Sequence, residues 1–321
     1  MNSNRWYLES AQAVSHDDEE KARAYQLTLT KPPGSLGVLE EIAVRFCGFQ
    51  HSLNPRCDNI CVRVFAADHG VCAQGVSAFP QVVTGQMIEN FLHGGAAISV
   101  LSESLNADFA VVNMGVVSPV GSHPKLHDRA IAPGSADFTQ GVAMSEAQCF
   151  AAMEAGRAEV LDADVFIGGE MGIGNTTAAS ALLALWLDLP ISTLVGPGTG
   201  LDPAGVQRKA QVVAAAVTKH KATENDPLKV LAALGGFEIA ALTGAYIACA
   251  QRGVPAVVDG FISTAAALAA VKINASVLPW LVFSHQSAEP GHRLALENLR
   301  ARPLLDIGMR LGEGSGAAVA L

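Results

Sequence analysis

Residues 165–187 read VFIGGEMGIGNTTAASALLALWL, and this stretch decides the fold that the sequence predicts. A short apolar run at 165–168 has the composition of a buried strand, and it leads through a glycine-rich turn into an apolar helix at 176–187. Backbone N–H groups at a helix N-terminus, together with threonine hydroxyl groups, form a cradle for a phosphate. The turn lacks the Gly-Lys-Ser/Thr ending of a P-loop, so it does not indicate an ATPase. The alternative is an ordinary helix cap, because Asn and Thr are favoured there.

Short apolar runs alternate with longer helical stretches from residue 59 onward, which is typical of βαβ units around a buried parallel sheet. Right-handed crossovers then favour an α/β fold: a doubly wound, mainly parallel sheet with helices on both faces, plus a small helical N-terminal part. The expected strands are 60–67, 109–114, 165–168, 193–195, 254–258 and 281–283. The expected helices are 80–105, 145–161, 176–187, 204–219, 236–252, 262–272 and 288–300.

The N-terminal part differs in character from the rest. Residues 1–30 are charged and weakly periodic, and the acidic residues at 17–20 are typical of a solvated helix start. The segment KPPGSLG at 31–37 follows, where Ser35 is expected to cap a helix. This segment is either a plain loop-to-helix junction or a binding loop that carries Lys31. We expect a helical arm of a small domain at 1–35 and an α/β catalytic domain at 36–321.

Composition limits the classes of function. The chain has 321 residues, of which 50% are hydrophobic and 16% charged, as in a globular protein with a sizeable core. A net charge of -9 argues against nucleic-acid binding, so any phosphate it binds is expected on a small molecule. The N-terminus has no apolar signal segment, and polar residues and Pro279 interrupt the apolar region 261–283, which predicts a cytosolic protein without a membrane span. The six cysteines are scattered, so we expect reduced thiols. The Asp, Glu and His residues near the expected strand ends have no recognisable metal-ligand spacing, so we expect no metal, and we expect no cofactor.

Polar residues follow the expected strands, and in a doubly wound sheet ligands bind at the carboxyl ends of the strands. Asp68-His69 after the first strand is either an acid/base pair or a hydrogen-bonded structural unit. Lys209, on the helix after a second glycine-rich turn, either supplies a charge to a bound phosphate or is solvated. The segments at the strand ends are 68–70, 169–177, 196–200, 259–260 and 284–287.

The stretch MRLGEGSGA at 309–317 places one carboxylate among three glycines. Glycine permits close approach of backbone and ligand, and an apolar surround raises the pKa of a carboxyl, which suits Glu313 as a general base. The alternative is a glycine-rich loop with a solvated glutamate. Between Phe79 and Met87, an aromatic, an amide and a thioether side chain form either a surface for a flat heteroaromatic ring or ordinary helix core.

Seven motifs in order resemble the nicotinate-nucleotide:dimethylbenzimidazole phosphoribosyltransferase family, which makes the lower-ligand nucleotide of cobalamin. The resemblance extends from about Lys31 to the last residue, and seven ordered motifs are far more specific than any single one. It implies a homodimer. The motifs are KPPGSLG (31–37), ADHGV (67–71), GEMGIGNTT (169–177), GGFEIAALTGA (235–245), DGFISTAAALAA (259–270), SHQSAEPGH (284–292) and MRLGEGSGAA (309–318).

The resemblance implies a reaction and a set of site residues. A nitrogen of 5,6-dimethylbenzimidazole attacks C1′ of nicotinate mononucleotide, nicotinate leaves, and α-ribazole 5′-phosphate forms with inversion. Glu313 matches the catalytic glutamate that takes the benzimidazole proton, and Glu170 matches a glutamate that stabilises positive charge on the ribose. The residues implied for the nucleotide are Gly172, Gly174, Asn175, Thr176, Thr177, Lys209 and Ser287. Those implied for the base are Phe79, Gln86, Met87, Met171 and Leu311.

Two departures from the family pattern keep alternatives open. Phe79 stands where some members carry a small polar residue, so a related transferase that uses a different base is an alternative. Members continue past the last motif with a helical segment, whereas this chain ends at Leu321, so the family's C-terminal helical extension is expected to be absent and a catalytically inactive nucleotide-binding protein is a second alternative. A Rossmann-type oxidoreductase is disfavoured, because no GxGxxG follows the first expected strand.

Overall fold

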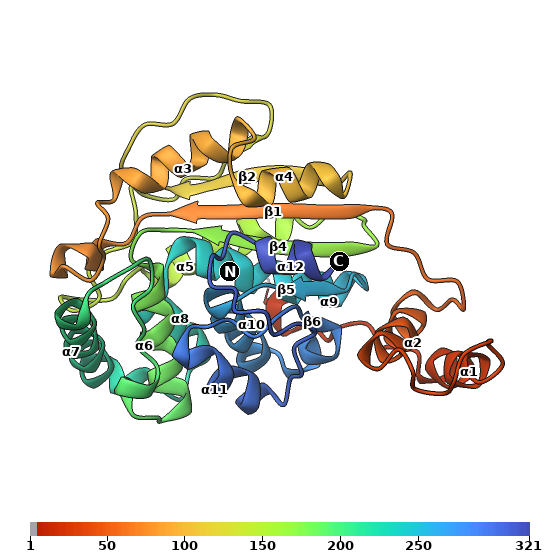
Figure 1. Cartoon of the computed structure of the whole chain (residues 1–321). Coiled ribbons are helices and arrows are strands. Elements are labelled where there is room, and N and C mark those ends of the chain that lie inside the picture. The colour runs from red at the N-terminus through yellow and green to blue at the C-terminus, as the bar shows by residue number, and fades with distance from the viewer. Residues whose placement is uncertain (1–4) are drawn as a thin grey trace.

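The computed structural model describes residues 5–321, and a parallel sheet of six strands lies at their centre (Figure 1). The strand order is β3-β2-β1-β4-β5-β6, so the chain starts in the middle of the sheet, builds one half and then returns to build the other. This order creates a switch point between β1 and β4, where ligands bind in doubly wound folds. The predicted fold class is confirmed. The strands are β1 (Ile60–Ala67), β2 (Asp108–Gly115), β3 (Leu126–Asp128), β4 (Val165–Met171), β5 (Ala256–Val258) and β6 (Leu281–Phe283).

The central strands are apolar on both faces because helices cover both faces. Every residue of β1 is buried, and so is every residue of β4 except Met171. Val62 of β1 pairs in parallel with Phe109 of β2 and with Ile167 of β4. In Figure 1, α3 and α4 lie on one side of these strands, and α9 and α10 lie on the other. The hydrophobic core therefore forms two layers, one against each face of the sheet.

Several helices begin at side-chain caps. Ser15 accepts a hydrogen bond from the backbone N–H of Asp18 at the start of α1, and Ser145 caps α5. Asp202 and Asp226 cap α7 and α8, each directly before a proline. Within residues 5–321, no helix combines the length and the apolar character needed to cross a membrane. The α-helices are α1 (His16–Gln26), α2 (Val38–Gln50), α3 (Val82–Leu92), α4 (Ala97–Ser104), α5 (Glu146–Ala158), α6 (Asn175–Leu187), α7 (Pro203–His220), α8 (Pro227–Leu234), α9 (Phe237–Arg252), α10 (Phe261–Ile273), α11 (Pro290–Leu299) and α12 (Ser315–Ala320).

Two differences from the expected strands have local causes. The expectation of a strand at 193–195 is wrong, because the chain there leaves a 3₁₀ turn that is closed by a hydrogen bond from the Thr193 N–H to the Pro190 carbonyl (2.9 Å). The sequence does not predict β3, whose three residues are half-buried or exposed. An edge strand of this length leaves no apolar run in the sequence.

Some helix boundaries differ from those expected from the sequence, and glycines lie at these boundaries. The expected helix at 80–105 is two helices, α3 and α4, because Gly94 adopts a φ of +79° and turns the chain between them. The expected helix at 236–252 corresponds to α9 alone, and α8, which the sequence does not predict, precedes it. Ser35 does not cap α2, since Gly37 occupies the N-cap position.

The helices α1 and α2 form an arm that projects from the body of the molecule (Figure 1). Arg45 of α2 attaches the arm to the body by donating from Nη2 to the carbonyl of Leu281 (3.0 Å). Phe49 stacks on Trp280 with 5.1 Å between the ring centroids. The expected domain boundary at residue 35 falls between the two helices of the arm, and the division into two domains stays a prediction.

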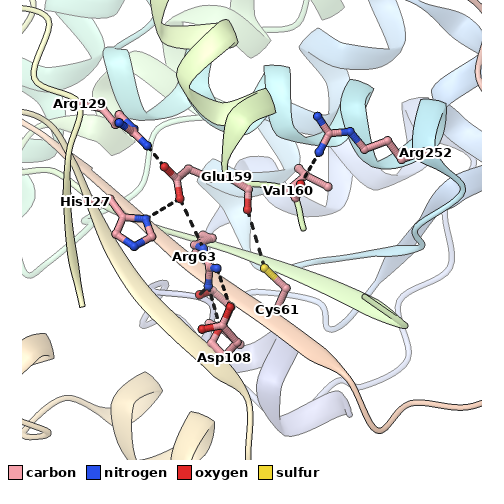
Figure 2. Close-up of polar contacts among 9 residues, drawn as sticks. Cys61, Arg63, Asp108, His127, Arg129, Glu159, Val160 and Arg252 are labelled. Carbon is pink, nitrogen blue, oxygen red and sulfur yellow. Dashed lines mark hydrogen bonds and ion pairs between the residues drawn. The ribbon is translucent and has the colours of Figure 1, made fainter. Parts of the chain in front are cut away.

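A charged cluster joins β1, β2, β3 and the end of α5 (Figure 2). The guanidinium of Arg63, whose side chain is 3% exposed, lies 2.7 Å from Asp108 Oδ2 and 3.6 Å from Glu159 Oε2. Glu159, 4% exposed, also lies 2.6 Å from Nδ1 of His127 and 3.1 Å from Nε of Arg129. A buried carboxylate in contact with two arginines and a histidine holds four elements of the sheet layer together, so the cluster is structural.

Replacing Glu159 with leucine is expected to lower the free energy of unfolding by about 3 kcal/mol, because the buried Arg63 charge loses its buried partner. Arg129→Ala, which removes a half-exposed partner, should cost about 1 kcal/mol or less. Chemical denaturation of the two variants checks this, and the double variant Arg63→Met/Glu159→Leu should regain most of the loss. Equal losses in the two single variants would contradict the assignment.

Candidate active site

A cleft with a cavity volume of about 220 Å³ opens at the carboxyl ends of β4, β5 and β6. This is the edge of the sheet where the strand order predicts a ligand. All predicted site residues line the cleft except Gln86 and Thr177. Those that line it are Phe79, Met87, Glu170, Met171, Gly172, Gly174, Asn175, Thr176, Lys209, Ser287, Leu311 and Glu313.

Gln86 and Thr177 lie outside the cleft because of helix periodicity. On α3, Val83 and Met87 are one turn apart and face the cleft, whereas the side chain of Gln86 is exposed on another face. On α6, Thr176 faces the cleft, so the next side chain, Thr177, is turned away by about 100° into the core, where it is fully buried. Each helix therefore contributes to the cleft only the side chains on one of its faces.

The turn before α6 arranges donors for an anion. Gly174 adopts a φ of +98°, and a Cβ there would lie 2.6 Å from Cys72 Sγ, so the position requires glycine. The sequence predicts that backbone N–H groups of this turn are free for a ligand. Those of Asn175 and Thr177 are not, because they donate to carbonyls of the turn. Side chains supply further donors at the cleft. Nζ of Lys209 donates to Thr176 Oγ1 over 2.8 Å.

Lys209 reaches the cleft from α7 and is 1% exposed. Burial lowers the pKa of its ammonium group to about 8, and the charge of Glu289 partly opposes this shift. The group is therefore still mainly protonated near neutral pH. A buried cation beside a hydroxyl group and a helix N-terminus suits a phosphate. The other lysine considered from the sequence, Lys31, lies outside the cleft and forms an ion pair with Glu40 (2.7 Å).

Glu313 lies in a left-handed turn that only a glycine-rich sequence can form. Its φ is +67°, and those of Gly312 and Gly314 are +87° and +90°. A non-glycine residue in this region is strained, and such strain is concentrated at functional sites. The turn rests on β4 at Gly169, where a Cβ would lie 2.0 Å from the carbonyl oxygen of Glu313. The glycines therefore let the end of the chain carry a carboxyl group into the cleft.

The carboxyl group of Glu313 is suited to accept a proton. The residue is 7% exposed, and its Oε2 has no hydrogen-bond partner in the described part of the chain. Burial, and secondly the charge of Asp259, raises the pKa of Glu313 to about 7. A general base is most effective when its pKa lies near the working pH.

Glu170 lies at the end of β4, beside the same turn. Burial, followed by the charge of Asp259, raises the pKa of this carboxyl well above its ordinary value. Nδ2 of Asn175 donates a hydrogen bond to Glu170 Oε2. A Cβ on Gly312 would lie 2.5 Å from Glu170 Oε1, so the two glutamate segments touch. Carboxyl groups from distant parts of the sequence thus share one wall of the cleft.

Two buried polar residues of the cleft received no role from the sequence. His285 is 2% exposed, and its Nδ1 lies 2.9 Å from Ser284 Oγ. Glu289 is 7% exposed, and its Oε2 has no partner among the described residues. Both belong to the motif SHQSAEPGH that follows β6, so their position at a strand end was the available signal.

Asp68-His69 does not line the cleft. Nε2 of His69 lies 2.6 Å from Oε1 of Glu238, and both residues are fully buried, which favours the structural alternative. Among residues 5–321, no group of three His, Cys, Asp or Glu side chains is arranged to hold a metal ion.

A doubly wound sheet whose switch-point cleft holds a buried lysine and two carboxyl groups of raised pKa defines an enzyme that works on a phosphorylated small molecule. A family model described as phosphoribosyltransferase matches residues 11–321. The nicotinate-nucleotide–dimethylbenzimidazole phosphoribosyltransferases of Pseudomonas fluorescens (strain Pf-5) and Pseudomonas syringae pv. syringae are 52% and 54% identical, over 99% of this chain and 92% of theirs. The crystal structure of CobT from Thermus thermophilus matches with a TM-score of 0.90 and 44% identity, over 95% of this chain and 92% of that chain. The chain belongs to the nicotinate-nucleotide–dimethylbenzimidazole phosphoribosyltransferase family, which confirms the resemblance seen in its motifs.

The raised pKa of Glu313 predicts a dependence of stability on pH. Its pKa is about 7 in the folded chain against 4.5 ordinarily, so the protonated carboxyl stabilises the fold, and this contribution is lost as the pH rises through 7. Glu313→Gln, which cannot ionise, is expected to be more stable than the parent by about 1–3 kcal/mol near pH 8.5 and nearly equal to it near pH 5. Chemical denaturation at the two pH values checks this, with the exposed Glu297→Gln as control. A difference that does not change with pH would contradict it.

Proposed function

We propose that this protein transfers the phosphoribosyl group of nicotinate mononucleotide to 5,6-dimethylbenzimidazole, giving α-ribazole 5′-phosphate and nicotinate. The reaction belongs to the assembly of the nucleotide loop of cobalamin. Family membership supports the substrates. The observation that carries the chemistry is the buried carboxyl of Glu313, which has a free oxygen and a pKa of about 7 in the cleft.

In the proposed reaction, Glu313 accepts the N–H proton of the benzimidazole while the other ring nitrogen attacks C1′ of the ribose. The bond from C1′ to the pyridine nitrogen breaks, and its electron pair neutralises the cationic nicotinate ring. Because the leaving group departs as a neutral pyridine, no acid has to protonate it. Attack opposite the leaving group inverts C1′. A positioned general base contributes about 10²–10⁴-fold to such a step.

Glu170 is assigned to the positive charge of the ribose and the nicotinate ring. Without a cation, burial keeps the pKa of this carboxyl well above its ordinary value. A cationic substrate beside it favours the ionised form and lowers that pKa. Substrate binding would thereby produce the carboxylate that stabilises charge at C1′ as the bond to nicotinate breaks.

The nucleotide phosphate is assigned to the wall formed by α6 and α7. Lys209 supplies the charge, the Thr176 hydroxyl and the Ser287 segment supply donors, and the turn at 172–175 supplies close backbone approach. A bound phosphate would raise the pKa of Lys209 again, because an anion favours the ammonium form. The side chain of Thr177 has no part in this proposal, since it lies in the core.

The benzimidazole is assigned to the apolar end of the cleft. Met87 of α3, Met171 of β4 and Leu311 line it, and thioethers adapt to a flat aromatic ring. Phe79 lies at the mouth and is 49% exposed, so it offers an aromatic face to the incoming base. A related transferase that uses a different base remains the main alternative. The inactive nucleotide-binding alternative is disfavoured, because Glu170 and Glu313 both face the cleft.

We also infer a homodimer in the cytosol. The arm formed by α1 and α2 carries exposed apolar side chains that a second copy would cover, among them Tyr25, Leu27, Leu36 and Leu39. All six cysteines are free, as is usual in a reducing compartment.

Light scattering after size exclusion is expected to give twice the mass of the chain, and the double variant Leu27→Asp/Leu39→Asp is expected to give the monomer, because it places charges in the apolar contact. The matched control is Leu53→Asp, which alters an exposed leucine that follows α2. A monomer from the unaltered chain, or a dimer that resists the arm variant but not the control, would overturn the inference.

Nicotinate release from nicotinate mononucleotide, with and without dimethylbenzimidazole, tests the proposed function. Release should require the base, should increase as the pH rises through about 7, and should fall by about 10²-fold or more in Glu313→Gln. Glu297→Gln, which alters an exposed glutamate that does not line the cleft, should keep the parent rate. A folded chain that binds the nucleotide but releases no nicotinate is the result that would sink the proposal.

A further inference from the structure

Asp259 connects the turn of Glu313 to the sheet. It follows β5 directly and is fully buried. Its Oδ2 accepts a hydrogen bond from the backbone N–H of Gly314 (3.0 Å), and its Oδ1 accepts one from the N–H of Ala317 (3.0 Å). One carboxylate therefore holds both the left-handed turn and the first turn of α12.

The surroundings of Asp259 leave its negative charge without a directly bonded cation among the described residues. The nearest cationic candidate is His285, whose Nδ1 lies 3.9 Å from Asp259 Oδ1 and is already 2.9 Å from Ser284 Oγ. A Cβ on Gly316 would lie 2.1 Å from His285 Cε1 and 2.9 Å from Asp259 Oδ1, so only glycine lets α12 approach these two side chains. Backbone N–H groups are thus the donors that satisfy this carboxylate.

We propose that Asp259 is a positioning residue that fixes the carboxyl of Glu313 at the cleft and, through its own negative charge, makes that carboxyl a stronger proton acceptor. The inference rests on the proposed function. It assigns two actions to one side chain, a tether through two backbone hydrogen bonds and a like charge close to the base. Asp259 does not line the cleft, so it acts through Glu313 and not on the substrate.

Other charged groups face Glu313 from the elements around it, and one of them, Glu170, also accepts a hydrogen bond from the backbone of Glu313, whereas Asp259 bonds both Gly314 and Ala317. Glu170 faces it from β4, and Glu238 lies behind Glu170 on α9. The remaining groups at the cleft are His285 after β6, Glu289 before α11, Lys209 on α7 and the exposed Arg310 on the same segment. Burial is the largest cause of the raised pKa of Glu313, and the charge of Asp259 is the second. The same charge also acts on Glu170.

Two substitutions separate the tether from the charge. Asp259→Asn removes the charge and, because an amide nitrogen cannot accept, one of the two hydrogen bonds. Asp259→Glu keeps the charge but lengthens the side chain and displaces the turn. We expect Asp259→Asn to shift the acidic limb of kcat/KM against pH downward by about one unit. Both variants should lower the plateau rate by about 10-fold or more, because the base is misplaced.

Asp306→Asn serves as the matched control, since it removes the same charge from an exposed position and should change neither quantity. A direct readout does not depend on turnover: ¹³C NMR titration of the Glu313 carboxyl, assigned with Glu313→Gln, should report a lower pKa in Asp259→Asn than in the unaltered chain.

The outcomes distinguish this inference from the proposed function. If the unaltered chain releases no nicotinate in the presence of dimethylbenzimidazole, the proposed function is overturned. The NMR titration of Glu313 would still decide the inference about Asp259. An unchanged Glu313 titration in folded Asp259→Asn, or a parent plateau rate in Asp259→Glu, would overturn the inference. If Asp259→Asn does not fold, the rate of Asp259→Glu alone decides whether the tether matters.

Discussion

The close contact between the left-handed turn at 312–314 and the end of β4 is the constraint on which the rest of the cleft depends. Gly169 on the strand and the glycines on both sides of Glu313 remove the side chains that would keep these backbones apart. The contact closes one wall of the cleft, buries the Glu313 carboxyl and sets it beside Glu170. Because the turn comes from the end of the chain and the strand from its middle, the site is complete only when the whole sheet is formed.

Buried charged groups are paired at one end of the sheet and partly unpaired at the other. In the cluster around Glu159, each buried charge has a partner that offsets the cost of its burial, and the strands are held together. At the carboxyl ends, Glu313 and Glu289 each have an oxygen without a partner among the described residues, and the pKa values of Glu170 and Glu313 are raised. Unpaired groups of this kind destabilise the fold, and those that line a cleft are available to a ligand. The core on both faces of the sheet supplies the stability that the cleft lacks.

Sequence patterns predict those elements of the fold whose burial leaves a continuous apolar run in the sequence. The strands β1 and β4 can be recognised from their long apolar runs, because both of their faces are covered. The strand β3, with three partly exposed residues, has no such run. The break between α3 and α4 depends on the positive φ of Gly94, which a helical pattern does not reveal. The motifs correctly identify the segments that form the cleft, but whether a residue of such a segment lines the cleft depends on the direction of its side chain. Thr177 and Gln86 therefore lie outside it, while Glu289 enters it from a motif that gave it no role.

The charges of the cleft explain why a cationic nucleotide suits it. Carboxyl groups outnumber the cations there, and burial forces Glu170 and Glu313 toward their protonated forms while it weakens Lys209 as a cation. In the proposed reaction, nicotinate mononucleotide brings a positive ring, which favours the ionised form of Glu170, and a negative phosphate, which favours the ammonium form of Lys209. In the proposed reaction, transfer to the benzimidazole removes the ring charge, because the proton goes to Glu313 and nicotinate leaves as a neutral pyridine ring. The proposed product therefore keeps the phosphate interaction but loses the one with Glu170, so the same electrostatics that favour binding of the substrate also favour release of the product.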